Sequence, residues 1–152
     1  MRQTGVSLIE SLIALLLISI ALLGVAGLQL TSLQDARDAR WRVEAISLAN
    51  GMLELMRTDA DEAAAFTLPL DAASPACGPS EPGACLRDAW LADVAQTLPN
   101  AVATVSVAQV NDVDRVAISL RWRQQPPDAA NPLPACGADA ASGGCVMLDT
   151  RL

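Results

Sequence analysis

A mostly apolar run without any charged residue extends from Ser11 to Gln34, and it is the most prominent feature of the sequence. A helix needs roughly 20 apolar residues to cross a bilayer core of about 30 Å, and the run is long enough to do so. It also exceeds the roughly 7 to 15 apolar residues of an ordinary secretory signal. The pattern therefore predicts a membrane-spanning helix that the mature protein keeps.

Helical spacing of apolar residues continues beyond this run through Val43, Ile46, Leu53 and Met56, with charged residues between them. Such a stripe is typical of a helix that buries one face and exposes the other. We therefore expect one continuous helix from Val6 to Arg57. Its N-terminal half would lie in lipid or against apolar partners, and its C-terminal half would pack on a globular domain.

Proline and glycine then interrupt the pattern from Thr67 to Gly83, which predicts a loop. A short helix is expected over Ala84–Leu98, because Pro99 ends a stretch with helical spacing. The large apolar residues that share one face of this helix are Leu86, Trp90, Val94 and Leu98.

Three alternating segments follow, at Ala101–Val110, Arg115–Arg123 and Val146–Leu152. Alternation of apolar and polar residues predicts strands with one buried face. Trp122 falls on the opposite face from its two arginine neighbours, which favours a core tryptophan over a surface for stacking on nucleic-acid bases. The economical fold is α+β, a long helix packed on a small three-stranded antiparallel sheet.

Composition narrows the function classes. The chain has 152 residues, a net charge of −7 and no histidine. An acidic domain is repelled by phosphate backbones, so we expect no direct nucleic-acid binding. Without histidine the commonest general base and metal ligand is missing, and the sequence has no phosphate-binding glycine loop. We therefore expect no enzyme activity, no metal and no cofactor.

The cysteines are Cys77, Cys85, Cys136 and Cys145. A positive charge before the apolar run, at Arg2, favours a cytoplasmic N-terminus and an exported remainder, where disulfides form. Four cysteines permit three connectivities, and the sequence leaves the crossed ones open. We favour pairing between neighbours, which would close two loops rich in proline and glycine. A zinc site fits less well, because neither pair has the spacing of a zinc knuckle.

Glu10 is the one acid at the head of the apolar run. A carboxylate in hydrocarbon costs about 2.5 to 3.5 kcal/mol on insertion scales, so an acid kept there marks a functional-site hypothesis. The alternative is an interfacial acid that reaches to water from the helix start.

Two other acidic groups have simpler explanations. Asp112 and Asp114 carry oxygens that suit calcium, but aspartates are also common where a hairpin reverses, and we favour the turn. Asp59, Asp61 and Glu62 fit a solvated helix end better than a site.

The stretch from Gly5 to Glu10, followed by the long apolar helix, resembles the N-terminus of type IV pilins and pseudopilins. The resemblance implies that a prepilin peptidase cuts after Gly5 and methylates the new amine of Val6. It also implies that Glu10 docks one subunit onto another. Val6 stands where the family usually has phenylalanine.

Further stretches, Gly24–Gln29, Ala49–Arg57 and the Trp90 helix that ends before Pro99, resemble the PilV group of minor pilins. The resemblance is closest over residues 5 to 57. It implies a structural protein of a priming complex that starts, and caps, a type IV pilus. Implied partners are other minor pilins, the major pilin and a tip adhesin.

This interpretation divides the chain into a leader peptide at residues 1–5, a transmembrane and polymerisation helix at 6–34 and a periplasmic globular domain at 35–152. The protein would cross the inner membrane once and then enter the pilus. Two alternatives remain open: a minor pseudopilin of a type II secretion system, and a membrane-anchored periplasmic binding protein that never polymerises.

Overall fold

The computed structural model describes residues 7–69, 76–111, 113–128, 132–133, 135–136 and 143–152. Contacts divide the chain into two compact units, Met1–Arg37 and Asp38–Leu152. Each unit is described on its own below.

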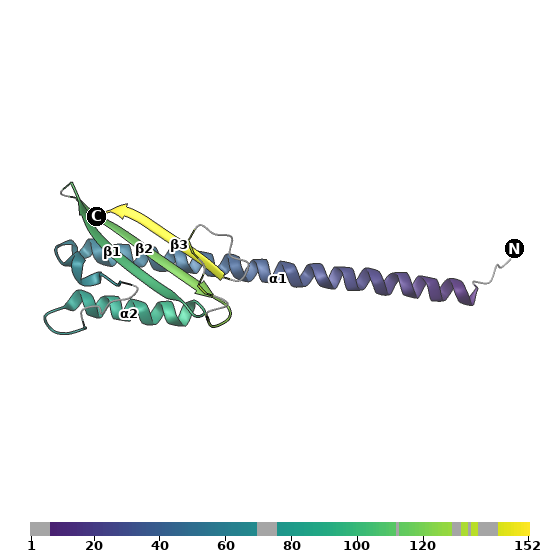
Figure 1. Ribbon diagram of the computed structural model, residues 1–152. Coiled ribbons are helices and arrows are strands. Elements are labelled where there is room, and N and C mark those ends of the chain that lie inside the picture. The colour runs from purple at the N-terminus through teal and green to yellow at the C-terminus, as the bar shows by residue number, and fades with distance from the viewer. Residues whose placement is uncertain (1–6, 70–75, 112, 129–131, 134, 137–142) are drawn as a thin grey trace. The chain divides into compact units, whose positions relative to one another are not determined.

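Helix α1 runs from Leu8 to Thr58 and contains no proline, with basic Arg57 in its last turn (Figure 1). The helix predicted from Val6 to Arg57 is therefore confirmed within the described residues, and Val6 lies outside them. Alanine, leucine and isoleucine dominate its first half, and leucine and alanine are good helix formers. Glycines at 24, 27 and 51 do not interrupt the helix.

The second unit holds the end of α1 followed by a short 3-10 helix, one α-helix and three strands. In chain order these are η1 (Ala60–Phe66), α2 (Pro82–Thr97), β1 (Val102–Val110), β2 (Val113–Arg123) and β3 (Gly143–Arg151). The predicted short helix and the three strands are confirmed, with ends that differ by up to three residues. The 3-10 helix was not predicted, because its alanine-rich sequence has no clear period.

The three strands form one antiparallel sheet in the order β1-β2-β3, so β2 lies in the middle (Figure 1). In the register of the sheet, Ser119 on β2 lies opposite Thr104 on β1 and Met147 on β3. The outer edge of β1 makes an isolated bridge in which Leu68 and Val105 exchange two backbone hydrogen bonds of 2.8 and 3.0 Å.

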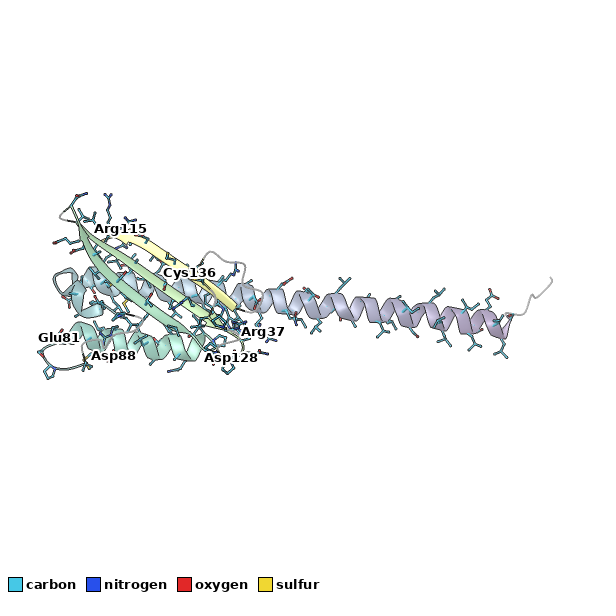
Figure 2. All side chains as sticks on the ribbon, in the orientation of Figure 1. Arg37, Glu81, Asp88, Arg115, Asp128 and Cys136 are labelled. Atoms are coloured by element: carbon cyan, nitrogen blue, oxygen red, sulfur yellow. A yellow bond between two sulfur atoms is a disulfide. The ribbon has the colours of Figure 1, made fainter. Side chains whose placement is uncertain are left out.

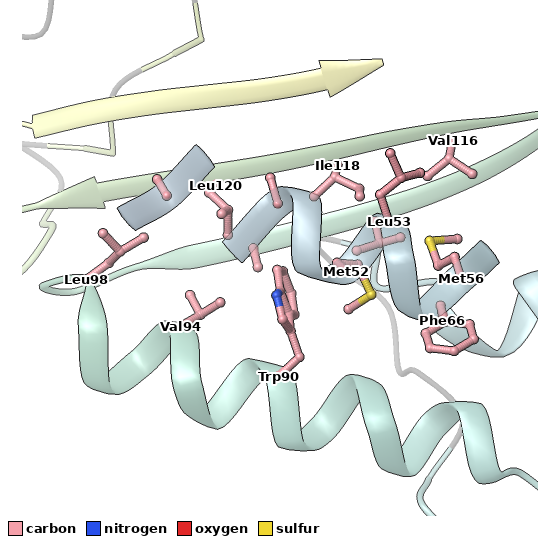
Figure 3. Packing of buried hydrophobic residues seen from close by; sticks show 14 of the residues in the cluster. Met52, Leu53, Met56, Phe66, Trp90, Val94, Leu98, Val116, Ile118 and Leu120 are labelled. Atoms are coloured by element: carbon pink, nitrogen blue, oxygen red, sulfur yellow. The ribbon is translucent and has the colours of Figure 1, made fainter. Parts of the chain in front are cut away.

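The core of this unit lies between the second half of α1, α2 and one face of the sheet (Figure 3). Alternate residues of β2 supply its sheet side, as the alternating sequence predicts, and α1 supplies alanines and methionines. Trp90 of α2 is 5% exposed, and its indole Nε1 donates a hydrogen bond of 2.9 Å to the Leu48 carbonyl oxygen on α1. The largest fully buried side chains are Trp122, Phe66, Met52, Met56, Leu98, Ile118, Leu120, Val105 and Val116.

Three details of the predicted apolar stripes are wrong. Val43 and Ile46 are 67% and 50% exposed, because the face of α1 that carries Ala45, Ala49 and Met52 turns toward the core. Small alanines let the helix approach its neighbours closely there. On α2, Leu86 is 41% exposed, while the next residue, an arginine, is buried.

Candidate functional site

The surface of α1 from Leu8 to Leu33 is an exposed apolar cylinder, and we refer to it as the apolar segment. Its large side chains are between about half and four-fifths exposed, for example Leu8 at 81% and Val25 at 51%. By length and composition α1 suffices to cross a membrane. Apolar area of this extent is favourable only when lipid or other apolar side chains cover it.

Glu10 lies in the first turn of α1 and is exposed. Its backbone N–H bonds to the Ser7 carbonyl oxygen at 3.0 Å. Among the residues that the structure describes, the Glu10 carboxylate has neither an ion-pair nor a hydrogen-bond partner. A helix N-terminus favours an anion by only about 0.3 to 1 kcal/mol, which is less than the penalty for a carboxylate in hydrocarbon. The helix end alone therefore does not stabilise Glu10 in lipid.

The two other residues of the predicted docking and processing site, Gly5 and Val6, lie outside the described residues. The structure consequently gives Glu10 its place on α1 but gives no geometry for the cleavage site.

The structure contains two disulfides, Cys77–Cys85 and Cys136–Cys145. Each joins cysteines close in sequence, eight and nine positions apart. The first ties the segment before α2 to its first turn, and the second ties the chain before β3 to the start of that strand. Both therefore act as staples on segments that contribute little to the core, rather than as metal ligands.

No metal site forms among the residues that the structure describes. Nowhere in them do three or more cysteine, aspartate or glutamate side chains gather as a ligand group. Of the two hairpin acids, Asp112 lies outside the described residues and Asp114 is partly exposed at the start of β2. Asp59 precedes η1 without capping it through its side chain, and nothing is described of the side chains of Asp61 and Glu62.

Arg87 on α2 is a buried cation that sequence reasoning missed. Its side chain is 2% exposed, and its Nη1 donates to the carbonyl oxygens of Ala65 and Thr67 at 3.1 and 3.4 Å. Its Nε and Nη2 donate to Asp88 Oδ1 at 3.0 and 2.7 Å. The guanidinium thus binds the carbonyl groups at the end of η1, which have no partners within that helix. A short 3-10 helix leaves no sequence pattern, so no signal pointed to this contact.

An ion pair lies on the outward face of the sheet, where Figure 2 labels its arginine. Arg115 binds Asp149 through Nε to Oδ1 at 2.7 Å and through Nη2 to Oδ2 at 2.9 Å. This hydrogen-bonded pairing lowers the pKa of Asp149 and raises the pKa of Arg115. Directly opposite Arg115 stands a like charge, Arg151, so Asp149 offsets a repulsion between neighbouring strands.

A long N-terminal apolar helix with a small three-stranded antiparallel sheet is the α+β arrangement of pilins. The family comparison agrees with this class. Residues 27–97 match the Tt1218-like family, described as type IV pilin Tt1218. The match spans just under half of the chain and shows similarity to a type IV pilin family. It covers the second half of α1, η1 and α2, and it does not include Gly5, Val6 or Glu10. Comparisons with curated proteins and with solved structures gave no match.

Proposed function

We propose that this protein is a minor pilin of the PilV type. In this proposal it is anchored in the inner membrane with residues 35–152 in the periplasm. It joins other minor pilins and the major pilin in the priming complex that initiates a type IV pilus and carries a tip adhesin. The observation that carries the proposal is Glu10, an acid without a partner in the described residues, at the head of the apolar segment of a pilin-like chain.

The proposed partner of Glu10 is the N-terminal amine of a neighbouring subunit, which processing after Gly5 would create on Val6. In a medium of low dielectric an unpaired charge is heavily penalised, and an ion pair with good geometry removes that penalty. Because the acid occupies a fixed position on α1, the pair would set how far one helix is shifted along the next.

The apolar segment would supply most of the association energy. Burying apolar area stabilises by about 25 cal/mol per Å², while a single ion pair mainly selects geometry. Outside the membrane the side chains from Leu12 to Leu33 must be covered by apolar helices of other subunits. Bundling of helices is therefore the expected outcome of extraction from lipid.

Replacing Glu10 tests the proposal. Glu10→Leu and the isosteric Glu10→Gln should insert into the membrane at normal levels, since both remove a charge from the apolar segment. We expect their incorporation into sheared pili to fall about tenfold or more, because loss of a paired charge costs several kcal/mol in a low dielectric. Quantitative immunoblots of membranes and of pili would measure both levels.

The matched control is Glu54→Leu, which removes an exposed acid from the second half of the same helix, where its ion pair among the described residues is with Arg57. This variant should enter pili normally. Incorporation of Glu10→Gln at the wild-type level would refute the docking role of Glu10.

Two further measurements separate the proposal from its rivals. Mass spectrometry of the mature protein should give a chain that starts at a methylated Val6, and an intact Met1 in sheared pili would contradict processing. Deletion of the gene should abolish twitching motility. Loss of enzyme secretion with normal motility would instead assign the chain to a type II secretion system.

A further inference from the structure

A groove lies on the outward face of the sheet, away from the buried cluster, and we call it the outer groove. Its volume is about 500 Å³. Side chains of β1, β2 and β3 form its floor, and the segment that bridges to β1 forms part of its wall. The outer groove lies wholly within Asp38–Leu152, so the inference drawn from it does not depend on Glu10 or on the assembly proposed above.

Most of the lining of the outer groove is apolar or already hydrogen-bonded. Leu68 and Pro69 line it, as does Met147, which is 61% exposed. The hydroxyls of Thr104 and Ser119 lie 2.6 Å apart and bond to each other. These groups offer contact area to a partner but leave no charge to be neutralised.

Arg121 is the exception. It lines the outer groove, and its Nε is buried without a hydrogen-bond partner. In the described part of the chain its guanidinium forms no ion pair, although the protein carries a net charge of −7. A buried polar nitrogen without a partner costs about 1 to 3 kcal/mol. Because Arg121 also lines the groove, an acceptor that another molecule brings to its guanidinium would be favoured.

Charge is distributed unevenly over the sheet. Alternation along β2 and β3 puts four arginines on the outward face, and the register adds only one acid, Asp149, to them. Asp149 pairs with Arg115, and Arg123 donates to the Pro132 carbonyl oxygen. Strands β2 and β3 therefore place more arginines than acids on the outward face of an acidic protein, and Arg121 is the one that lines the outer groove.

We propose that the outer groove binds an acidic segment of a partner protein, in which a carboxylate lies beside a large apolar side chain. The carboxylate would accept hydrogen bonds from Arg121, and the apolar neighbour would cover Met147 and Leu68. A nucleic acid fits less well. A duplex presents about one phosphate charge per 1.7 Å of its axis, whereas the groove offers one cation among apolar and hydroxyl side chains on an acidic chain.

Peptide binding to the full chain in neutral detergent micelles tests this proposal. The probe is a fluorescein-labelled hexapeptide that alternates aspartate and leucine, followed by anisotropy at low salt. Its matched peptide carries asparagine in place of aspartate. We expect the acidic peptide to bind about tenfold more tightly than the neutral one, as for a charge-assisted hydrogen bond.

Arg121→Gln should remove that preference. The matched control, Arg151→Gln, removes the same charge from the same face, but Arg151 does not line the outer groove and lies opposite Arg115 at the far end of the register. It should change the affinity by about twofold or less, as expected for a screened surface charge. Thermal melting of both variants checks that the fold is intact.

A second variant introduces a carboxylate from the protein itself into the outer groove, where it would compete with the carboxylate of the peptide. Met147→Glu lies in the row of side chains next to Arg121 and should abolish peptide binding with Arg121 retained, whereas Met147→Gln should not. Three results would overturn the proposal: equal binding of acidic and neutral peptides, equal losses in Arg121→Gln and Arg151→Gln, or tighter binding of a short DNA duplex than of the acidic peptide.

Discussion

Arg87 shows how a single side chain connects two segments of the second unit. It lies on α2, binds the carbonyl oxygens at the end of η1 and is held by its neighbour Asp88. Burial of an arginine costs free energy unless its donors find acceptors. Apolar side chains at this position would leave the carbonyl groups of η1 without a partner.

We predict that Arg87→Met lowers the free energy of unfolding by about 1 to 3 kcal/mol, the cost of leaving a buried carbonyl unsatisfied. Arg87→Lys should recover only part of that loss, because one ammonium group does not reproduce the planar fork of the guanidinium. Urea unfolding of the wild type and both variants would measure this. Asp88→Asn is the comparison variant, and its effect should be smaller than that of Arg87→Met, because asparagine keeps an acceptor oxygen for the guanidinium and leaves the bonds to η1 in place. If Arg87→Met leaves the free energy of unfolding unchanged, other contacts hold η1.

Asp149 gives a pH dependence with a definite sign. Its pairing with Arg115 lowers its pKa below the ordinary value of 3.8. The pair therefore contributes stability that is fully present above the pKa of the unfolded chain and is lost as the pH falls through the pKa of the folded state.

Asp149→Asn should accordingly melt below the wild type at neutral pH, and the difference should shrink as the pH falls through the folded-state pKa of Asp149. The effect should be small and should shrink with salt, because the pair is exposed. Melting temperatures of both proteins from pH 2 to 7 would measure this difference. A difference that stays constant or grows as the solution is acidified would contradict the assignment.

At the scale of elements, the sequence predicted the helices and strands in which apolar residues recur at a regular spacing. Val116, Ile118, Leu120 and Trp122 alternate strictly, and all four are buried on one face of β2. The long helix and a three-stranded antiparallel sheet followed from the same reasoning, whereas the order of the strands was not predicted. A 3-10 helix has no comparable pattern, so η1 and its contact with Arg87 were missed.

The candidate site divides in the same way. The sequence pattern alone identified Glu10, because an acid at the head of an apolar run can be recognised without a structure. Arg121 was seen only as a neighbour of Trp122, and its place in the outer groove depends on strand register and on the bridge at Leu68. Contacts between segments distant in sequence carry no local signal.

Pairing of β2 with β3 places Gly144 directly opposite Trp122. A Cβ added at Gly144 would overlap the indole ring, which is only 2% exposed and has no room to move. Gly144→Ala should therefore lower the free energy of unfolding by about 1 to 3 kcal/mol, as overpacking does, although alanine favours a strand more than glycine.

Gly51→Ala is the matched control for this substitution. A Cβ there meets nothing within 4 Å, and alanine stabilises a helix interior by about 1 kcal/mol relative to glycine. Denaturant unfolding should move in opposite directions for the two variants. Equal effects would mean that Trp122 adapts its position.

At the scale of the whole molecule, the two units differ in how their apolar side chains are shielded from water. Every buried hydrophobic side chain of the described chain lies at Ala45 or beyond, inside Asp38–Leu152. The apolar segment contributes nothing to that core and needs lipid, detergent or other helices as its surroundings. Both disulfides also lie in the second unit.

A chain that begins at Asp38 should consequently fold by itself, stay soluble without detergent and form the same two disulfides. Its melting temperature should lie within about 4 °C of the full chain in detergent, a difference that corresponds to about 1 kcal/mol or less for a domain of this size. Reduction of the disulfides is the internal control, because each closes a short loop and should contribute about 2 to 3 kcal/mol. Aggregation of the oxidised fragment, or a much lower melting temperature, would mean that residues before Asp38 support the core. A stable fragment would instead show that the apolar segment is free to bind membrane or partner helices without cost to the fold.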